Sequence, residues 1–235
     1  KILFRDGVDE EGYVLVRKTD AQIQDKMAIS LADASYYYNQ LLKKGGQEQA
    51  ALNRGPLAAP FIAHLPQAVG IVIGWLFHAN GMITLYLGKI TALFFYLLCV
   101  FWAVRFMPWG KTVMAVIALF PMSLEIAASY SYDCTVNALS FLFIGYTMYL
   151  IYEKERVTWK DYAFLTIVGM WMAPCKLVYI FVCGIIFLIP SSKSKNPRAV
   201  LVGKIGIIVV IGIVTMLLRG AVVANLTSAP QTGYS

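Results

Sequence analysis

Acidic residues are few in most of this sequence, and its cysteines lack the spacing of a metal-binding motif. Residues 60–235 hold five Asp/Glu against twelve Lys/Arg, so the whole formal net charge of +7 lies in that part. The four cysteines lie in or beside apolar runs, at spacings that match no metal-binding pattern. The sequence has no phosphate-binding glycine loop, dinucleotide fingerprint, zinc-helix motif or G-x-S-x-G element. Soluble-nucleotide chemistry therefore has no support, and the cysteines are interpreted as buried, reduced thiols.

Apolar residues are abundant instead. They make up 59% of the chain, which is too high for a soluble globular domain of this length. We therefore expect a membrane protein, in which surplus Lys/Arg between spans records orientation in the bilayer and not nucleic-acid binding. With no initiator Met and no signal-peptide region before Lys1, the chain is expected to be a piece of a longer protein.

Residues 1–59 form a polar segment that is predicted to be a small loop domain. The runs "KILF" and "YVLV" are typical of short strands. Residues 20–44 are predicted to be a helix, because Asp20 is a suitable N-cap and Gly45-Gly46 a suitable stop.

Residues 60–235 are predicted to be the transmembrane domain, since a helix needs about 20 apolar residues to cross the hydrocarbon core. The run 160–190 is too long for one span, and Pro174 and Lys176 near its middle favour two short helices with a turn between them. Whether residues 61–79 cross the bilayer or lie embedded in its surface stays open. The expected elements are a helix at 61–79, spans at about 82–104, 112–130, 134–152 and 199–222, and the short pair at 160–190.

Basic residues predict which side each connection faces. The connections "RFMPWGK", "EKERVTWK" and "SSKSKNPR" are rich in Lys/Arg, which collect on the cytoplasmic side of a membrane protein. If residues 160–190 cross and return, residues 131–133 and the turn at Lys176 both fall on the opposite, outer side.

Asp133 is an isolated carboxylate between two strongly apolar runs, with no basic residue between Lys111 and Lys154 in the sequence. One interpretation is a helix N-cap, where a carboxylate is stabilised by about 0.5 to 2 kcal/mol. The other is a site residue that acts as a general base or binds a divalent cation. Glu125 lies inside an apolar run, where an acid is costly. It would share one helix face with Ser129 and Asp133 if that helix continued.

Lysines near the predicted outer surface are candidates for holding a lipid phosphate. Lys176 is interpreted either as a snorkelling side chain at a helix end or as a positive charge for a phosphate or pyrophosphate group, and Lys89 has the same two interpretations. His64 is a further candidate, although neither it nor His78 has the spacing of a zinc site.

Three segments carry a resemblance to a known family: "HLPQAVGIVIGWLF" at 64–77, "LYLGKITALFFYLL" at 85–98 and "LFPMSLEIAASYSYDCTVNAL" at 119–139. They resemble an uncharacterised bacterial family of multi-spanning membrane proteins, a domain of unknown function that is grouped with the GT-C glycosyltransferases. The block "SYDCTVNA" is also similar to the "SYDNEGIA"-type block of oligosaccharyltransferase catalytic subunits, with Thr135 where that block has a glutamate.

The resemblance implies an all-α, polytopic, GT-C-like protein of the bacterial cytoplasmic membrane. In it, residues 1–59 would be an extracytoplasmic loop domain and residues 61–79 a helix embedded at the membrane surface. Such enzymes transfer a sugar from a polyprenyl-phosphate donor to an acceptor at the outer face, using an acid in the first outer loop. That acid would precede Lys1, and the acids of "RDGVDEEG" are poor substitutes for it. The resulting assignment is catalysis by Asp133 and substrate binding by Lys176, Lys89, Glu125, Tyr132, Asn137 and His64.

Two other functions stay open. A transporter or flippase of lipid-linked glycans would use Glu125 as a proton or ion relay within the bilayer. A non-catalytic subunit would instead pack against a partner membrane protein through its apolar faces. The expected partners are a polyprenyl-phosphate lipid and the membrane lipids, with no nucleic acid. The sequence does not name the sugar, the acceptor or any cofactor, and a divalent cation at Asp133 stays open.

Overall fold

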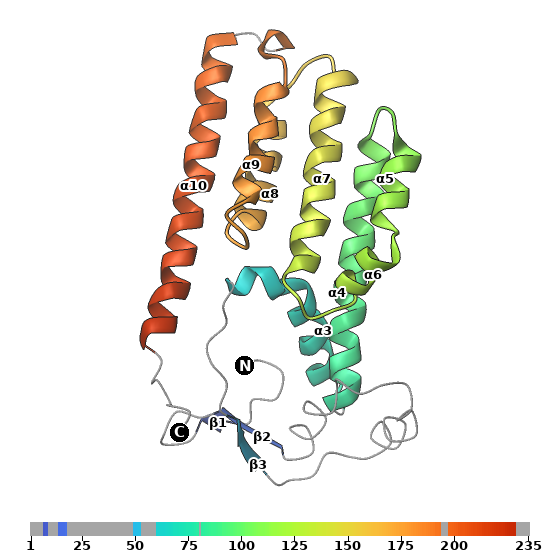
Figure 1. Ribbon diagram of the computed structural model, residues 1–235, viewed down its shortest axis with the longest axis vertical. Helices are drawn as coiled ribbons and strands as arrows, with labels where there is room; N and C mark the ends of the chain where they lie inside the picture. The colour runs from blue at the N-terminus through green and yellow to red at the C-terminus, as the bar shows by residue number, and fades with distance from the viewer. Residues whose placement is uncertain are drawn as a thin grey trace. The chain divides into compact units, whose positions relative to one another are not determined.

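The computed structural model describes residues 7–8, 14–17, 49–52, 60–79, 81–193 and 197–228 (Figure 1). The chain divides into two compact units, one of Lys1–Pro56 with Pro66–Thr91 and the other of Leu57–Leu65 with Ala92–Ser235. The run "KILF" and the helix expected at residues 20–44 lie outside the described residues.

The described residues of the polar N-terminal segment form three short antiparallel strands. β1 (Gly7–Val8) pairs with β2 (Val14–Arg17), and β2 pairs with β3 (Gln49–Leu52). In the second pairing Val14 lies opposite Leu52, and Arg17 opposite Gln49. Strand β2 confirms the strand expected from "YVLV".

From residue 60 onward the described chain is helical, so the all-α prediction is confirmed for this part. Three of the described helical segments are long and apolar enough to cross a membrane: Met82–Phe106, Asp133–Tyr152 and Val200–Val223. The elements in chain order are η2 (Phe61–His64), α3 (Leu65–Leu76), α4 (Gly81–Phe106), α5 (Lys111–Ala118), α6 (Pro121–Ala127), α7 (Asp133–Tyr152), α8 (Trp159–Met172), α9 (Tyr179–Cys183), η3 (Gly184–Leu188), η4 (Ser191–Lys193) and α10 (Pro197–Ser228).

In the first unit, α3 approaches the start of α4 through two glycines four residues apart. A Cβ atom on Gly70 would lie 2.3 Å from the Leu87 carbonyl oxygen, and one on Gly74 would lie 2.7 Å from Thr84 Oγ1. Neither position has room for a side chain. Small residues at this spacing are typical of closely packed helix pairs in membranes.

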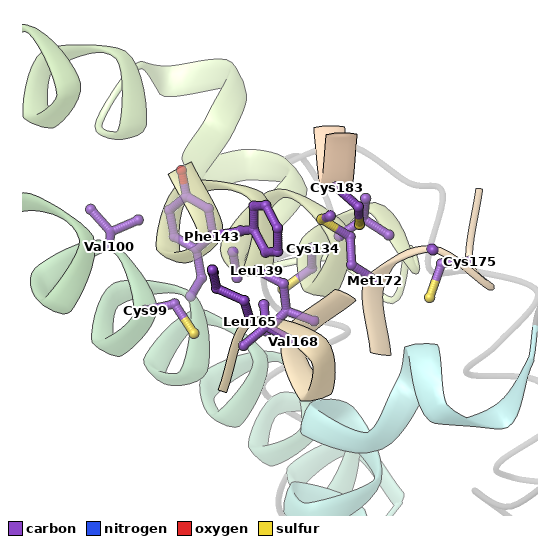
Figure 2. Packing of buried hydrophobic residues seen from close by; sticks show 14 of the residues in the cluster. Cys99, Val100, Cys134, Leu139, Phe143, Leu165, Val168, Met172, Cys175 and Cys183 are labelled. Carbon is purple, nitrogen blue, oxygen red and sulfur yellow. The ribbon is translucent and has the colours of Figure 1, made fainter. Parts of the chain in front are cut away.

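In the second unit, α8 packs against α7 and α10, and α9 packs against all three of these helices. Their shared core is apolar, and Figure 2 shows Leu139 and Phe143 of α7 beside Leu165 and Val168 of α8. The four cysteines are buried free thiols in this core, as expected from the sequence.

The apolar run 112–130 is not one helix, which corrects the expectation of a single span there. Helix α5 ends at Ala118 and α6 begins at Pro121, whose missing N–H and fixed φ suit the first turn of a new helix. Phe120 before the proline is extended, with φ −55° and ψ 141°. The hydroxyl of Tyr96 on α4 donates a hydrogen bond to the Ala118 carbonyl over 2.8 Å. That bond provides a partner for a carbonyl at the end of α5.

Where α7 ends and α8 begins, charged side chains bind the backbone groups and the capping residue of the helix ends. Thr158 and Asp161 form a reciprocal capping box at the start of α8. Lys154 lies 2.6 Å from the Asp161 carboxylate, and Tyr146 donates a hydrogen bond to the same oxygen over 2.6 Å. Lys193 donates to three backbone carbonyls at and just beyond the C-terminal end of α7, at 2.6 to 3.2 Å. These lysines therefore have structural roles besides any role in orientation.

Candidate functional site at the ends of α7 and α8

Residues 129–133 form the polar junction between α6 and α7. Helix α6 ends at Ala127, so the continuous helix that would place Glu125, Ser129 and Asp133 on one face is absent, which corrects that expectation. Ser131 Oγ accepts a hydrogen bond from the Asp133 N–H over 3.1 Å. The same hydroxyl donates to Asp133 Oδ2 over 3.3 Å. A serine therefore caps this N–H, and the Asp133 side chain is available for another contact.

That contact is an ion pair with Lys176, which lies in the turn between α8 and α9. Lys176 Nζ is 2.6 Å from Asp133 Oδ1, and the two side chains are 41% and 30% exposed. The chain turns here because α8 ends at Met172, close to Pro174. The two residues that the sequence placed on one side of the protein thus lie in direct contact. The catalytic and phosphate-binding roles given to them stay predictions.

The aromatic ring of Tyr132 lies beside this pair, with its centroid 5.3 Å from Lys176 Nζ. At this distance the ring face attracts the ammonium group. The hydrogen bond to Asp133 raises the pKa of Lys176, while burial opposes the increase. Lys176 is therefore protonated at neutral pH.

Hydrogen bonds to its backbone carbonyls hold the short helix η2 against α7 and α8. Thr135 on α7 and Trp171 on α8 donate hydrogen bonds, of 2.6 and 2.8 Å, to the carbonyls of the two residues that precede His64. The His64 ring lies edge-on to that of Tyr132, with centroids 6.5 Å apart. Burial lowers the pKa of His64, so its imidazole is neutral at pH 7.

The other predicted residues are placed differently. Asn137 lies about one turn into α7, with its amide oxygen 3.5 Å from the Tyr179 hydroxyl, at the limit of a hydrogen bond. Glu125 is exposed on α6. Lys89 belongs to the first unit, where its ammonium lies 5.9 Å from the Tyr86 ring centroid. The candidate site of the second unit is therefore formed by Asp133, Lys176, Tyr132, His64 and Asn137.

Within the described part of the chain, no group of three or more His, Cys, Asp or Glu side chains is arranged for a metal ion. Thr135, which stands where the oligosaccharyltransferase-type block has an acid, is fully buried. Its hydroxyl donates to the η2 backbone instead.

Two cations of α10 are absent from the sequence-based site. Lys204 is buried within the apolar helix, and its ammonium donates to the Ile189 carbonyl and to Ser191 Oγ, which makes it a structural residue. Arg219 lies further along the same helix, and its charge acts on Cys175, the neighbour of Lys176. Its sequence signal is a lone arginine near the end of an apolar run, which is equally typical of a snorkelling side chain.

Taken together, these helices are those of a helical membrane protein, with three described segments able to cross a bilayer by length and composition. Residues 56–234 match the model of a family described as predicted membrane protein DUF2142, and the chain belongs to this family of unknown function. The matched range includes every residue of the candidate site. No curated protein and no solved structure matches the sequence.

Proposed function

We propose that this protein is a GT-C-type glycosyltransferase of the bacterial cytoplasmic membrane. It would move a sugar from a polyprenyl-phosphate donor to an acceptor at the outer membrane face. The observation that carries the proposal is the contact between Asp133, where α7 begins, and Lys176, in the turn after α8. Their charged atoms are 2.6 Å apart and both side chains are partly exposed. The reaction needs two charged groups, a carboxylate that accepts a proton and an ammonium group that stabilises the phosphate.

The chemistry assigns one role to each group. The Asp133 carboxylate accepts the proton of the acceptor hydroxyl as the hydroxyl oxygen forms a bond to the anomeric carbon of the sugar. The bond between that carbon and the phosphate oxygen breaks, and its electron pair stays on the phosphate. The Lys176 ammonium stabilises the negative charge on this leaving group. A partly desolvated site strengthens both contacts relative to water.

Neighbouring residues would hold the sugar. Tyr132 and His64 form an aromatic corner beside the ammonium, and an aromatic ring suits the apolar face of a sugar. Asn137 and Tyr179 offer an amide and a hydroxyl, which can each donate and accept hydrogen bonds with sugar hydroxyls. The neutral His64 imidazole adds one donor and one acceptor.

The test is transfer of radiolabelled hexose from purified polyprenyl-phosphate hexoses to acceptors in bacterial membrane extract, by the full-length protein in proteoliposomes. Asp133→Asn and Lys176→Ala are each expected to reduce transfer by about a hundredfold or more, because each removes a group that acts in the transition state. Arg156→Gln, at an exposed arginine between α7 and α8, is the control and should retain full activity. Full activity in both site variants contradicts the proposal. Movement of intact lipid-linked sugar across the bilayer, without transfer, would instead indicate a flippase.

A further inference from the structure

Two positive side chains lie near the turn between α8 and α9, and they differ in their partners. Lys176 is paired with Asp133, whereas Arg219 on α10 makes no ion pair with any residue that the structure describes. On the predicted topology both lie at the outer end, where Lys and Arg are depleted. An arginine inside an apolar membrane segment is also costly unless it has a function or a partner. The pair of cations therefore needs an explanation.

The packing of α8 against α10 brings Arg219 to the level of this turn. The two helices run in the same direction (Figure 1). They are in register at Gly169 and Ile211, since a Cβ atom on Gly169 would lie 2.7 Å from Ile211 Cδ1. Six residues after Gly169 the chain reaches Cys175, and eight residues after Ile211 it reaches Arg219. Helix α10 is continuous through Arg219, whereas α8 ends at Met172 and the chain then turns. Cys175 and Arg219 therefore both lie beyond the Gly169–Ile211 contact, toward the same end of the bundle.

The electrostatics of Cys175 agree with this register. Burial raises the pKa of the Cys175 thiol to about 11, the positive charge of Arg219 opposes the increase, and the negative charge of Asp133 adds to it. Arg219 and Asp133 are therefore both near enough for their charges to act on Cys175, which directly precedes Lys176 in the chain. Both the Arg219 and the Lys176 side chains are partly exposed, so a ligand at the membrane surface can reach them.

We infer that Lys176 and Arg219 together bind a phosphate monoester group, and that the Asp133 carboxylate occupies Lys176 until the phosphate displaces it. The inference rests on the proposed function and deepens it, because it concerns the same site. Without ligand the three side chains have a net charge of +1, and with Asp133 displaced the two cations present +2 to the ligand. A phosphate monoester carries about −1.5 to −2 at neutral pH, which matches that charge.

The two cations bind such a group in different ways. An arginine guanidinium makes two parallel hydrogen bonds to phosphate oxygens, which fixes orientation, whereas a lysine ammonium acts as a point charge. Displacement also frees Asp133 at the moment the phosphate arrives. In the proposed transfer this monoester is the polyprenyl phosphate that leaves, because the sugar-bearing donor is a phosphodiester with one negative charge. Binding of the monoester and release of Asp133 from Lys176 are thereby linked, and the carboxylate is held by Lys176 when no phosphate monoester is present.

The experiment measures binding of radiolabelled polyprenyl monophosphate to the full-length protein in nanodiscs, with uncharged polyprenol as the reference lipid. Arg219→Gln is expected to weaken phosphate binding about tenfold, because a hydrogen-bonded charge contact is lost. Asp133→Asn is expected to strengthen it by up to about tenfold, because the internal competitor for Lys176 is removed. Arg105→Gln, at an exposed arginine in the last turn of α4, is the matched control and should bind as the wild type does.

Further variants separate binding from folding. Arg219→Lys keeps the charge and should retain most of the affinity, and Asp133→Ala should strengthen binding as Asp133→Asn does. Thermal unfolding of each variant in detergent shows whether it is folded. Competition by soluble glycerol 1-phosphate, with the same dependence on Arg219 and Asp133, would support the phosphate site and assign it to a soluble ligand. Failure of the wild type to bind either phosphate compound overturns the inference, as does wild-type affinity in Arg219→Gln or Asp133→Asn.

The outcomes also separate this inference from the proposed enzymatic function. If the wild type transfers sugar while Arg219→Gln binds the phosphate normally, the inference is wrong and the glycosyltransferase proposal stands. If binding depends on Arg219 and Asp133 as described but the wild type transfers no sugar, the glycosyltransferase proposal fails and the phosphate site stands. Asp133→Asn is the most informative variant, since it should lose transfer and gain affinity together.

Discussion

The Ser131 hydroxyl caps the Asp133 N–H, and Asp133 makes the ion pair with Lys176. From the sequence, Asp133 has two interpretations, a helix N-cap or a site residue. The isolation of Asp133 and the unusual position of Lys176 are visible in the sequence. Their contact spans 43 residues, and it depends on the lengths of α7 and α8 as well as on the turn. For that reason the sequence predicts a shared side of the protein but not the ion pair.

Arg219 could not be assigned to the site from the sequence for a related reason. A single arginine near the end of an apolar run is equally typical of a snorkelling side chain. Only the register between Gly169 and Ile211 connects it with the Lys176 turn. That register depends on the absence of a side chain at Gly169, which is a packing property and has no periodic signal in the sequence.

The Lys176–Asp133 pair predicts a pH dependence of stability at the alkaline end. The pKa of Lys176 in the folded protein is raised above its ordinary value of 10.5. The pair therefore stabilises the fold fully below pH 10.5, and this contribution is lost as the pH rises through the raised pKa. Because the lysine side chain is 41% exposed, solvent screening limits the contribution to about 1 kcal/mol or less.

The measurement compares the free energy of unfolding of the wild type with that of Lys176→Gln in detergent, from about pH 8 to pH 12. The difference should be largest near pH 8 and should decrease as the pH rises above 10.5. Lys160→Gln, an exposed lysine in the first turn of α8, is the control and should show no such trend. A difference that stays constant over the whole range, or that grows with pH, would show that the ion pair does not stabilise the fold.

Proline explains both the expected and the unexpected helix ends. Pro174 predicts a break in the run 160–190, and the structure has a turn there between α8 and α9. Pro121 carries the same signal within the run 112–130, where α6 begins. Its neighbours are so apolar that hydropathy alone favours a continuous span. The sequence therefore contained the information for both breaks, but apolar run length and proline position gave opposite predictions at the second one.

Glycine contacts between α3 and α4 predict which substitutions this helix pair tolerates. A Cβ atom at Gly70 would lie 2.3 Å from the Leu87 carbonyl oxygen, and backbone cannot move aside as the end of a flexible side chain can. Gly70→Ala is therefore expected to destabilise the protein by about 1 to 3 kcal/mol. Gly206→Ala on α10 is the matched control, because nothing lies within 4 Å of the added methyl group. It should be neutral or stabilising, since alanine favours a helix by about 0.5 to 1 kcal/mol over glycine.

Thermal unfolding of the two variants in the same detergent checks this prediction, with a lower midpoint expected for Gly70→Ala alone. Equal midpoints for the two variants would mean that α3 and α4 do not pack as closely as the structure has them. Gly74 approaches Thr84 of α4 in the same way as Gly70 approaches Leu87. Gly74→Ala should reproduce the effect.

At the scale of the whole molecule, the structure changes which residues support the predicted orientation. Lys154 and Lys193 have structural partners, an aspartate and a set of backbone carbonyls, so their position follows from helix capping as well as from the membrane. Four exposed basic residues in or next to the connections between α4 and α5 and between α7 and α8 have no such explanation, namely Arg105, Lys111, Arg156 and Lys160. Their excess over the two cations near the α8–α9 turn still predicts that their end of the second unit faces the cytoplasm.

This orientation is tested by labelling single cysteines in bacterial spheroplasts with a membrane-impermeant maleimide. Leu177→Cys, at an exposed position next to Lys176, should be labelled in intact spheroplasts. Lys160→Cys, at an exposed position near the start of α8, should be labelled only after permeabilisation. The wild type should give little signal, because its four cysteines are buried. The reverse pattern would place Asp133 and Lys176 in the cytoplasm, where an outer-leaflet lipid donor does not reach them, so both the predicted topology and the proposed transfer at the outer face would be wrong.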